Sequence, residues 1–316
     1  MRRIEAPTLD DVYAARERIR TSVLRTPLVR FDVDAPCEIF LKLETLQPIG
    51  SFKLRGAMNA IRLLAPDALS RGVYTASAGN MAQGVAWGAL ALRIPCTVVM
   101  PDSAPQTKLD AVQRLGARVV QVPYEQWWQT LVDHGRAGMD GTFIHPVADR
   151  AVIAGNGTVG LEIIEDLPDA AAVLVPFGGG GLAAGIATAV RALAPAARVY
   201  GCEVGTATPL TAAFAAHEPV IVERTASFVD GIGGRGVLPE MWPLVSVLLH
   251  GAVVSSLAEV GSAVRLLVER ARIVAEGAGA TPVAAALAGR AGAGKVVCVV
   301  SGGNIDLRTL IELLRG

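Results

Sequence analysis

Short, uncharged β-branched runs alternate with helix-like segments along most of this 316-residue chain, and this alternation constrains the fold more than any other feature. Examples are Val173 to Phe177 and Val296 to Val300, each followed by a stretch in which apolar residues recur with helical spacing. Such runs are typical of strands in parallel sheets that are covered by helices on both faces. The sequence therefore predicts an α/β fold. Because no repeat, low-complexity stretch or linker is present, we expect any two domains to be interleaved.

Composition excludes several classes of protein. Hydrophobic residues make up 52% of the chain, charged residues 18%, and the formal net charge is zero. A nucleic-acid binder needs a basic surface, and a disordered chain has fewer apolar residues. The uncharged segment from Ala170 to Val190 is long enough to span a membrane, but its run of glycines favours a strand, a loop and a helix. No apolar stretch follows the first residues, so we expect no signal peptide and a cytoplasmic protein.

Four consecutive glycines, Gly178 to Gly181, lie between an apolar strand and a helix that begins near Leu182. Backbone amides of a side-chain-free loop at a helix N-terminus form an anion site, so this loop predicts phosphate binding rather than only a tight turn. A dinucleotide site is the alternative, because Gly179-x-Gly181-x-x-Ala184 matches the relaxed fingerprint. In that case Glu203, at the end of the next strand, would bind a ribose.

Lys53 lies in Ser51-Phe52-Lys53-Leu54-Arg55-Gly56 and is one of only four lysines. A lysine amine can form an imine with an aldehyde, although most lysines are solvated surface charges. Together with the glycine run, this segment suggests a pyridoxal phosphate (PLP) site, which a nucleotide interpretation leaves unexplained.

Two further turns follow apolar strands. The first runs from Thr75 to Gly84 through Ser77-Ala78-Gly79-Asn80, and the second is Ser301-Gly302-Gly303-Asn304. Both can present amides and hydroxyls to a ligand, but each is also compatible with an ordinary helix cap. The four histidines share no spacing, which predicts structural roles rather than a metal site.

Together these segments resemble the fold-type II PLP enzymes, in particular the serine/threonine dehydratases (ammonia-lyases) and the related serine racemases. The resemblance covers nearly the whole chain and includes the segments Arg25 to Leu28, Leu41 to Pro48, Val152 to Thr158 and Ala275 to Ala280. It implies a fold like that of the tryptophan synthase β subunit, with a large PLP-binding domain at 1–50 plus 148–316 and a small domain at 51–147. It also implies a homodimer without the C-terminal regulatory domain of biosynthetic threonine deaminases.

The resemblance also implies a role for each motif. Lys53 would hold PLP as an imine and later move the Cα proton, with Phe52 beside the ring. Asn80 would bind the ring oxygen and Ser301 the pyridine nitrogen, with Glu276 nearby. The phosphate would be bound by Gly178, Gly179, Gly180, Gly181 and Leu182. The turn Ser77, Ala78, Gly79, Asn80 and Met81 would bind the substrate carboxylate. Because serine is a weak partner for the ring nitrogen, loss of the β-hydroxyl should be favoured.

The expected activity is β-elimination from L-threonine, L-serine or a related β-hydroxy amino acid, which yields a 2-oxo acid and ammonia. A racemase and a non-catalytic PLP-binding protein are the alternatives. Ala78 stands where serine racemase has the serine that serves as its second acid/base, which favours elimination over racemisation. Met81 replaces the usual histidine, and we expect it to tolerate larger β-substituents. Glu203 and Ala207 match the divalent-cation site of the racemase, but Pro209 replaces an aspartate ligand. Glu203 and Ala207 are therefore only weak candidates for metal ligands, and the sequence leaves activation by a divalent cation open.

Overall fold

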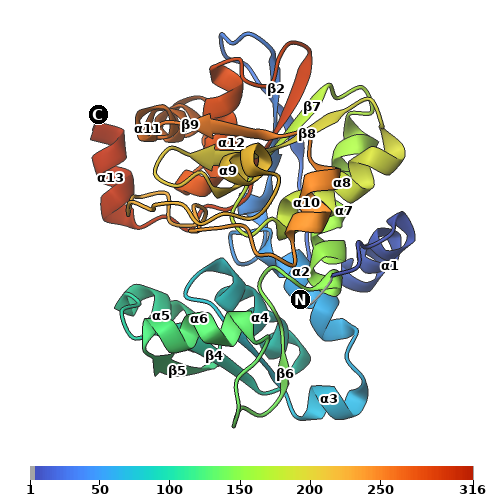
Figure 1. Ribbon diagram of the computed structural model, residues 1–316, viewed down its shortest axis with the longest axis vertical. Coiled ribbons are helices and arrows are strands. Elements are labelled where there is room, and N and C mark those ends of the chain that lie inside the picture. Colours follow the sequence, from blue (N-terminus) through green and yellow to red (C-terminus); the bar gives the residue numbers. More distant parts are fainter. Residues whose placement is uncertain (1–3, 316) are drawn as a thin grey trace.

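Two sheets organise the computed structural model of the protein, which describes residues 4–315 (Figure 1). The larger sheet has the strand order β1-β2-β10-β7-β8-β9 and the smaller one β5-β4-β3-β6. All neighbouring strands are parallel except β1 and β2, which are antiparallel. The α/β fold with mainly parallel sheets is thus confirmed. The predicted domain boundaries at 50/51 and 147/148 stay a prediction.

The strands have the following bounds: β1 Leu28–Phe31, β2 Glu38–Leu43, β3 Val73–Ala76, β4 Cys96–Pro101, β5 Arg118–Val122, β6 Thr142–Phe143, β7 Ala172–Pro176, β8 Arg198–Val204, β9 Ala252–Ser255 and β10 Lys295–Val300. The helices are α1 Leu9–Ile19, η1 Glu44–Leu46, α2 Lys53–Arg62, α3 Pro66–Ser70, α4 Asn80–Leu92, α5 Gln106–Gln113, α6 Tyr124–Val132, α7 Arg150–Asp166, α8 Gly181–Leu193, α9 Pro209–Ala216, α10 Trp242–Leu248, α11 Leu257–Leu266, η2 Leu267–Ala271, α12 Gly277–Leu287 and α13 Leu307–Arg315.

The central strands of the large sheet are buried on both faces. In β7, Val173 and Val175 contribute to a core with α7, α8 and α10, whereas Ala172 and Leu174 contribute to a core with α11 and α12. Side chains of a strand alternate between the two faces, so a strand covered on both sides must be apolar throughout. The uncharged segment from Ala170 to Val190 forms β7, a loop and most of α8, and burial on both faces of the sheet explains why its strand carries no charge. Within residues 4–315, no helix is long and apolar enough to cross a membrane.

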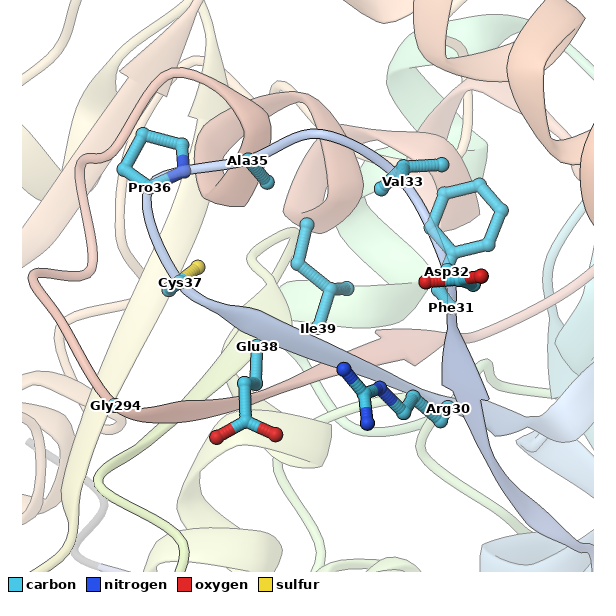
Figure 2. A pocket seen from close by; sticks show the side chains of 10 residues that line it. All are labelled: Arg30, Phe31, Asp32, Val33, Ala35, Pro36, Cys37, Glu38, Ile39 and Gly294. Atoms are coloured by element: carbon cyan, nitrogen blue, oxygen red, sulfur yellow. The ribbon is translucent and has the colours of Figure 1, made fainter.

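Strand direction places the candidate residues at one edge of each sheet. The glycine loop follows β7 and the Ser301 turn follows β10, so both lie at the carboxyl edge of the large sheet. The turn from Ser77 to Asn80 follows β3 at the same edge of the small sheet. A cavity of about 360 Å³ lies instead beside the β1–β2 connection, at the amino ends of β2 and β10 where Glu38 and Gly294 lie (Figure 2). It contains none of the candidate site residues.

A buried cluster of four charged residues joins the large sheet to α2 and α7. Arg55 of α2 contacts Glu44 Oε1 at 2.8 Å through Nη2 and Glu162 Oε1 at 2.6 Å through Nη1. Lys42 Nζ lies 2.5 Å from Glu162 Oε2. All four side chains are at most 5% exposed, and their formal charges cancel. Removing one charge would leave another uncompensated in the interior.

We therefore predict that Glu162→Gln lowers the free energy of unfolding by about 3–5 kcal/mol, because both Lys42 and Arg55 lose their shared carboxylate. Glu165→Gln, on the same helix, is the matched control. Its partners Arg16 and Arg25 are partly exposed, so the loss should be about 0.2–1 kcal/mol. Urea unfolding of the two variants measures the difference, and equal losses would contradict a structural role for the cluster.

Candidate active site

Lys53 is the first residue of α2, and although the residue is partly exposed, its amine lies in a desolvated position. Its Nζ donates a hydrogen bond to the carbonyl oxygen of Pro146 at 2.8 Å and lies 5.2 Å from the centre of the Phe52 ring. Burial lowers the pKa of the amine to about 8, and the negative charge of Glu276 opposes this shift. An amine with such a pKa is neutral far more often near pH 7 than an ordinary lysine is.

The other three lysines are held in ion pairs. Lys42 pairs with Glu162 in the interior, Lys108 lies 2.8 Å from Asp230, and Lys295 lies 2.6 Å from Asp169. Among residues 4–315, Lys53 has no carboxylate within ion-pair distance. This distinguishes Lys53 as the lysine suited to act as a nucleophile or a base.

The Ser301 turn contacts the start of α2. The backbone N–H of Phe52 donates to Ser301 O at 3.0 Å, and that of Gly303 donates to Gly50 O at 2.9 Å. Ser301 is buried at the end of β10, with only 2% of its surface exposed. The structure thus brings together two motifs that are far apart in sequence.

Asn80 links the small sheet to the large one. Its Nδ2 donates to Glu276 Oε1 at 2.9 Å, and its Oδ1 accepts a hydrogen bond of 2.7 Å from Asn304. Glu276 precedes α12, and burial raises the pKa of its carboxyl to about 7, a shift that the hydrogen bond from Asn80 opposes. Asn304 belongs to the Ser301 motif, but the motif alone predicts no role for its side chain.

The turn before α4 is open to a ligand. Ser77, Ala78, Gly79 and Asn80 are all partly exposed, and a Cβ placed on Gly79 would meet no heavy atom within 4 Å. The first backbone amides of α4 have no partner within the helix and favour an anion such as a carboxylate. This turn therefore combines open space for a ligand with backbone amides that favour an anion.

Met81 does not line this open space. Its side chain is 1% exposed and packs with Ala57, Ile61 and Val85 in a core beneath the turn. The expectation that Met81 enlarges the substrate pocket is therefore wrong, because its side chain points into the protein interior. Of Met81, only the backbone can contact a ligand in this turn. Leu182, beside the glycine loop, is likewise 5% exposed and part of the large core, so only its backbone can contact a phosphate.

The glycine loop packs against a neighbouring segment that side chains would displace. A Cβ on Gly179 would lie 2.5 Å from Val147 Cγ2, and one on Gly181 would lie 3.0 Å from Val147 O. Gly180 has φ +91°, a left-handed conformation that favours glycine. Gly178 and Gly179 are partly exposed at the N-terminus of α8. This geometry fits a phosphate group held by backbone amides.

The side chain of Glu203 caps the start of α9 and does not face the glycine loop as a ribose ligand would. Its carboxylate accepts hydrogen bonds from the backbone amides of Leu210 at 2.6 Å and Thr211 at 2.9 Å, at the start of α9. The residue is 1% exposed, and burial raises its pKa. Glu203 therefore cannot reach a ribose, which removes the acid on which the dinucleotide alternative depends. Ala207, the other weak candidate for a cation site, is also buried.

His134 and His145 lie beside Glu240, although the spacing of the histidines in the sequence does not indicate such a group. His134 Nε2 lies 2.7 Å from Glu240 Oε1, and the rings of His134 and His145 stack with centroids 4.3 Å apart. Their potential ligand atoms all lie within 4.8 Å of one another. The planes of the two rings differ by only 27°, so their in-plane lone pairs do not converge on one ion. This geometry favours a hydrogen-bonded stack over a metal centre.

Comparison with known proteins identifies the family. The family model described as "Pyridoxal-phosphate dependent enzyme" matches residues 19–302. The chain belongs to this family of enzymes. It is 40% identical to an L-threonine ammonia-lyase of Geobacter sulfurreducens, over 95% of this chain and 76% of the relative.

Solved structures agree on the fold. A serine racemase from maize has a TM-score of 0.89 and 30% identity, covering 98% of both chains. The processed form of threonine deaminase isoform 2 from Solanum lycopersicum has a TM-score of 0.85 and 30% identity, covering 99% of this chain and 96% of its own. The resemblance to fold-type II PLP enzymes, first seen in the motifs, is thus confirmed, and the residues around Lys53 fit PLP.

We predict that a charge on the glycine loop weakens PLP binding. A Cβ on Gly180 would point at Val245 and Phe177 in the core, whereas Gly178 is partly exposed and a Cβ there would lie 3.4 Å from Gly231 O. Gly178→Ala therefore adds only a methyl group, whereas Gly178→Asp also adds a carboxylate to the loop proposed to hold phosphate. The Asp variant should bind PLP on the order of tenfold or more weakly than the Ala variant, because like charges repel. Absorbance titration with PLP measures both affinities.

Gly116→Asp is the matched control for this prediction. Gly116 has a left-handed φ of +79° and lies in an exposed turn, where an added Cβ would meet nothing within 4 Å. This variant should bind PLP as the unchanged protein does. Equal affinities for the Ala and Asp variants at position 178 would show that the loop does not hold an anion.

Proposed function

We propose that this protein catalyses the PLP-dependent β-elimination of L-threonine, L-serine or a related β-hydroxy amino acid, which releases a 2-oxo acid and ammonia. The observation that carries the proposal is the position of Lys53, a desolvated amine with a pKa of about 8 beside the Ser301 turn. The 40% identity to an L-threonine ammonia-lyase supports the same activity. We further propose that the protein is a cytoplasmic homodimer.

PLP, when bound, supplies an electron sink for the negative charge that forms at the substrate Cα. The glycine loop would hold its phosphate, Ser301 would face its ring nitrogen, and Phe52 would pack beside its ring. The side-chain amide of Asn80, which donates to Glu276 in this structure, would donate to the ring oxygen of PLP instead. Each of these groups lies on a separate segment, so the fold rather than the local sequence fixes their arrangement.

The protein's own groups would bind the substrate and move its protons. The turn from Ser77 to Met81 would orient the carboxylate through the first amides of α4. Lys53 would remove the Cα proton, which requires a neutral amine. With a pKa of about 8, the neutral fraction near pH 7 is roughly two-hundredfold larger than for an ordinary lysine. The β-hydroxyl takes up one proton and leaves as water, which balances the Cα proton held by Lys53. The released enamine then takes up water to give the oxo acid and ammonia.

The decisive experiment maps the lysine that holds PLP. Borohydride reduction followed by peptide mapping should place the pyridoxyl group on Lys53. Lys53→Ala should lower ammonia release by about 10²–10⁴-fold, because it removes the base. Lys295→Ala is the control, since that residue pairs with Asp169 at the opposite edge of the sheet and should leave activity unchanged. Label on Lys42, Lys108 or Lys295 would contradict the assignment.

Racemisation is the second candidate function, because the maize serine racemase has a TM-score of 0.89. A racemase needs an acid/base on the face of the substrate opposite the lysine. In serine racemase this group is a serine of the turn, and Ala78 stands at the matching position. Alanine has no proton to give. Elimination should therefore dominate.

We accordingly predict that L-serine gives pyruvate and ammonia with little D-serine. Ala78→Ser should raise the share of D-serine, because it adds a hydroxyl at a partly exposed position of the open turn. Chiral chromatography alongside an ammonia assay measures both products. D-serine forming as fast as pyruvate in the unchanged protein would show that another residue acts as the second base.

A further inference from the structure

The connection between β6 and α7 is folded around the side chain of His145. This ring is 2% exposed, and its Nδ1 accepts hydrogen bonds from the backbone amides of Val147 at 3.0 Å and Ala148 at 2.6 Å. An atom that accepts from two N–H groups carries no proton, so the ring proton of the neutral imidazole is on Nε2. The turn therefore requires one tautomer of a neutral ring, because an imidazolium would set its own Nδ1–H against the amides.

The turn contacts two parts of the active site at once. The carbonyl oxygen of Pro146 accepts the hydrogen bond from Lys53 Nζ at 2.8 Å. The side chain of Val147 packs so closely on Gly179 that a Cβ there would lie 2.5 Å away. Residues 145–148 thus connect the reactive amine with the loop proposed to hold phosphate.

We propose that His145 is a positioning residue for the reaction. By accepting hydrogen bonds from the two backbone amides, Nδ1 of His145 fixes the position of the Pro146 carbonyl, which accepts a hydrogen bond from the free amine of Lys53. It also fixes the position of Val147, which packs against the glycine loop. This inference rests on the proposed function, since it takes Lys53 as the reactive amine and the loop as the phosphate site. His145 acts through the backbone of its neighbours.

Two substitutions isolate the accepting atom. His145→Asn keeps an oxygen one bond beyond Cγ, near the place of Nδ1, whereas His145→Gln carries its oxygen one bond further out. The Gln variant should bind PLP about 10–100-fold more weakly, as happens when supporting partners of a bound group are removed. Its kcat should fall about 100-fold, because the amine is misplaced. The Asn variant should recover most of both.

His250→Gln is the matched control. His250 Nδ1 also accepts a backbone amide, that of Val199 at 3.1 Å, but at the start of β8 and away from Lys53. This variant should keep the PLP affinity and kcat of the unchanged protein. If His145→Gln and His145→Asn behave alike in both measurements, the accepting atom has no positioning role.

Two readouts do not depend on activity. Hydrogen exchange at the amides of Val147 and Ala148 should be faster in the Gln variant than in the Asn variant. A ¹⁵N spectrum of the unchanged protein should show His145 Nδ1 without a proton, and a protonated Nδ1 would overturn the proposal even if His145→Gln fails to fold. If the unchanged protein takes up no PLP, the proposed function fails, while the exchange rates and the ¹⁵N spectrum still decide the role of His145.

Discussion

The buried cluster around Arg55 is the interaction on which the site depends. Arg55 joins α2 to Glu44 after β2 and to Glu162 of α7, so α2 cannot shift without separating buried charges. Lys53 lies two residues before Arg55 on the same helix, and two residues correspond to about 200° of rotation. One side of α2 is therefore anchored in the interior while the other presents the amine to the site.

Two lysines with desolvated amines show how the surroundings decide what an amine can do. Lys42 has a carboxylate 2.5 Å away and belongs to a neutral cluster, so its charge is compensated. Lys53 has only a carbonyl oxygen at 2.8 Å, and burial lowers its pKa to about 8. Both amines have lost solvent, but only that of Lys53 has lost it without gaining an ion pair. The chemistry thus depends on where carboxylates are absent as much as on where the lysine lies.

Local patterns predicted the elements that alternate most regularly. The apolar runs Val173 to Phe177 and Val296 to Val300 correspond to β7 (Ala172–Pro176) and β10 (Lys295–Val300). The motifs at Lys53, Gly178 to Gly181 and Ser301 were found because glycine runs and strand-end turns leave a local signal. The direction of the Met81 side chain left none, since a helix start does not reveal which neighbours pack on it. The role of His145 depends on a turn that contacts two distant segments, at Lys53 and at the glycine loop, so no sequence pattern could indicate it.

The two key protonation states depend on how the sheets meet. Asn80 follows the small sheet and binds Glu276 of the large-sheet side, and Lys108 pairs with Asp230 across the same boundary. Burial raises the pKa of Glu276 to about 7 and lowers that of Lys53 to about 8, so both shifts arise from the exclusion of water. If the two sheets moved apart, water would return both groups toward their ordinary values. Exclusion of water thus favours the neutral form of both groups, the acid and the amine.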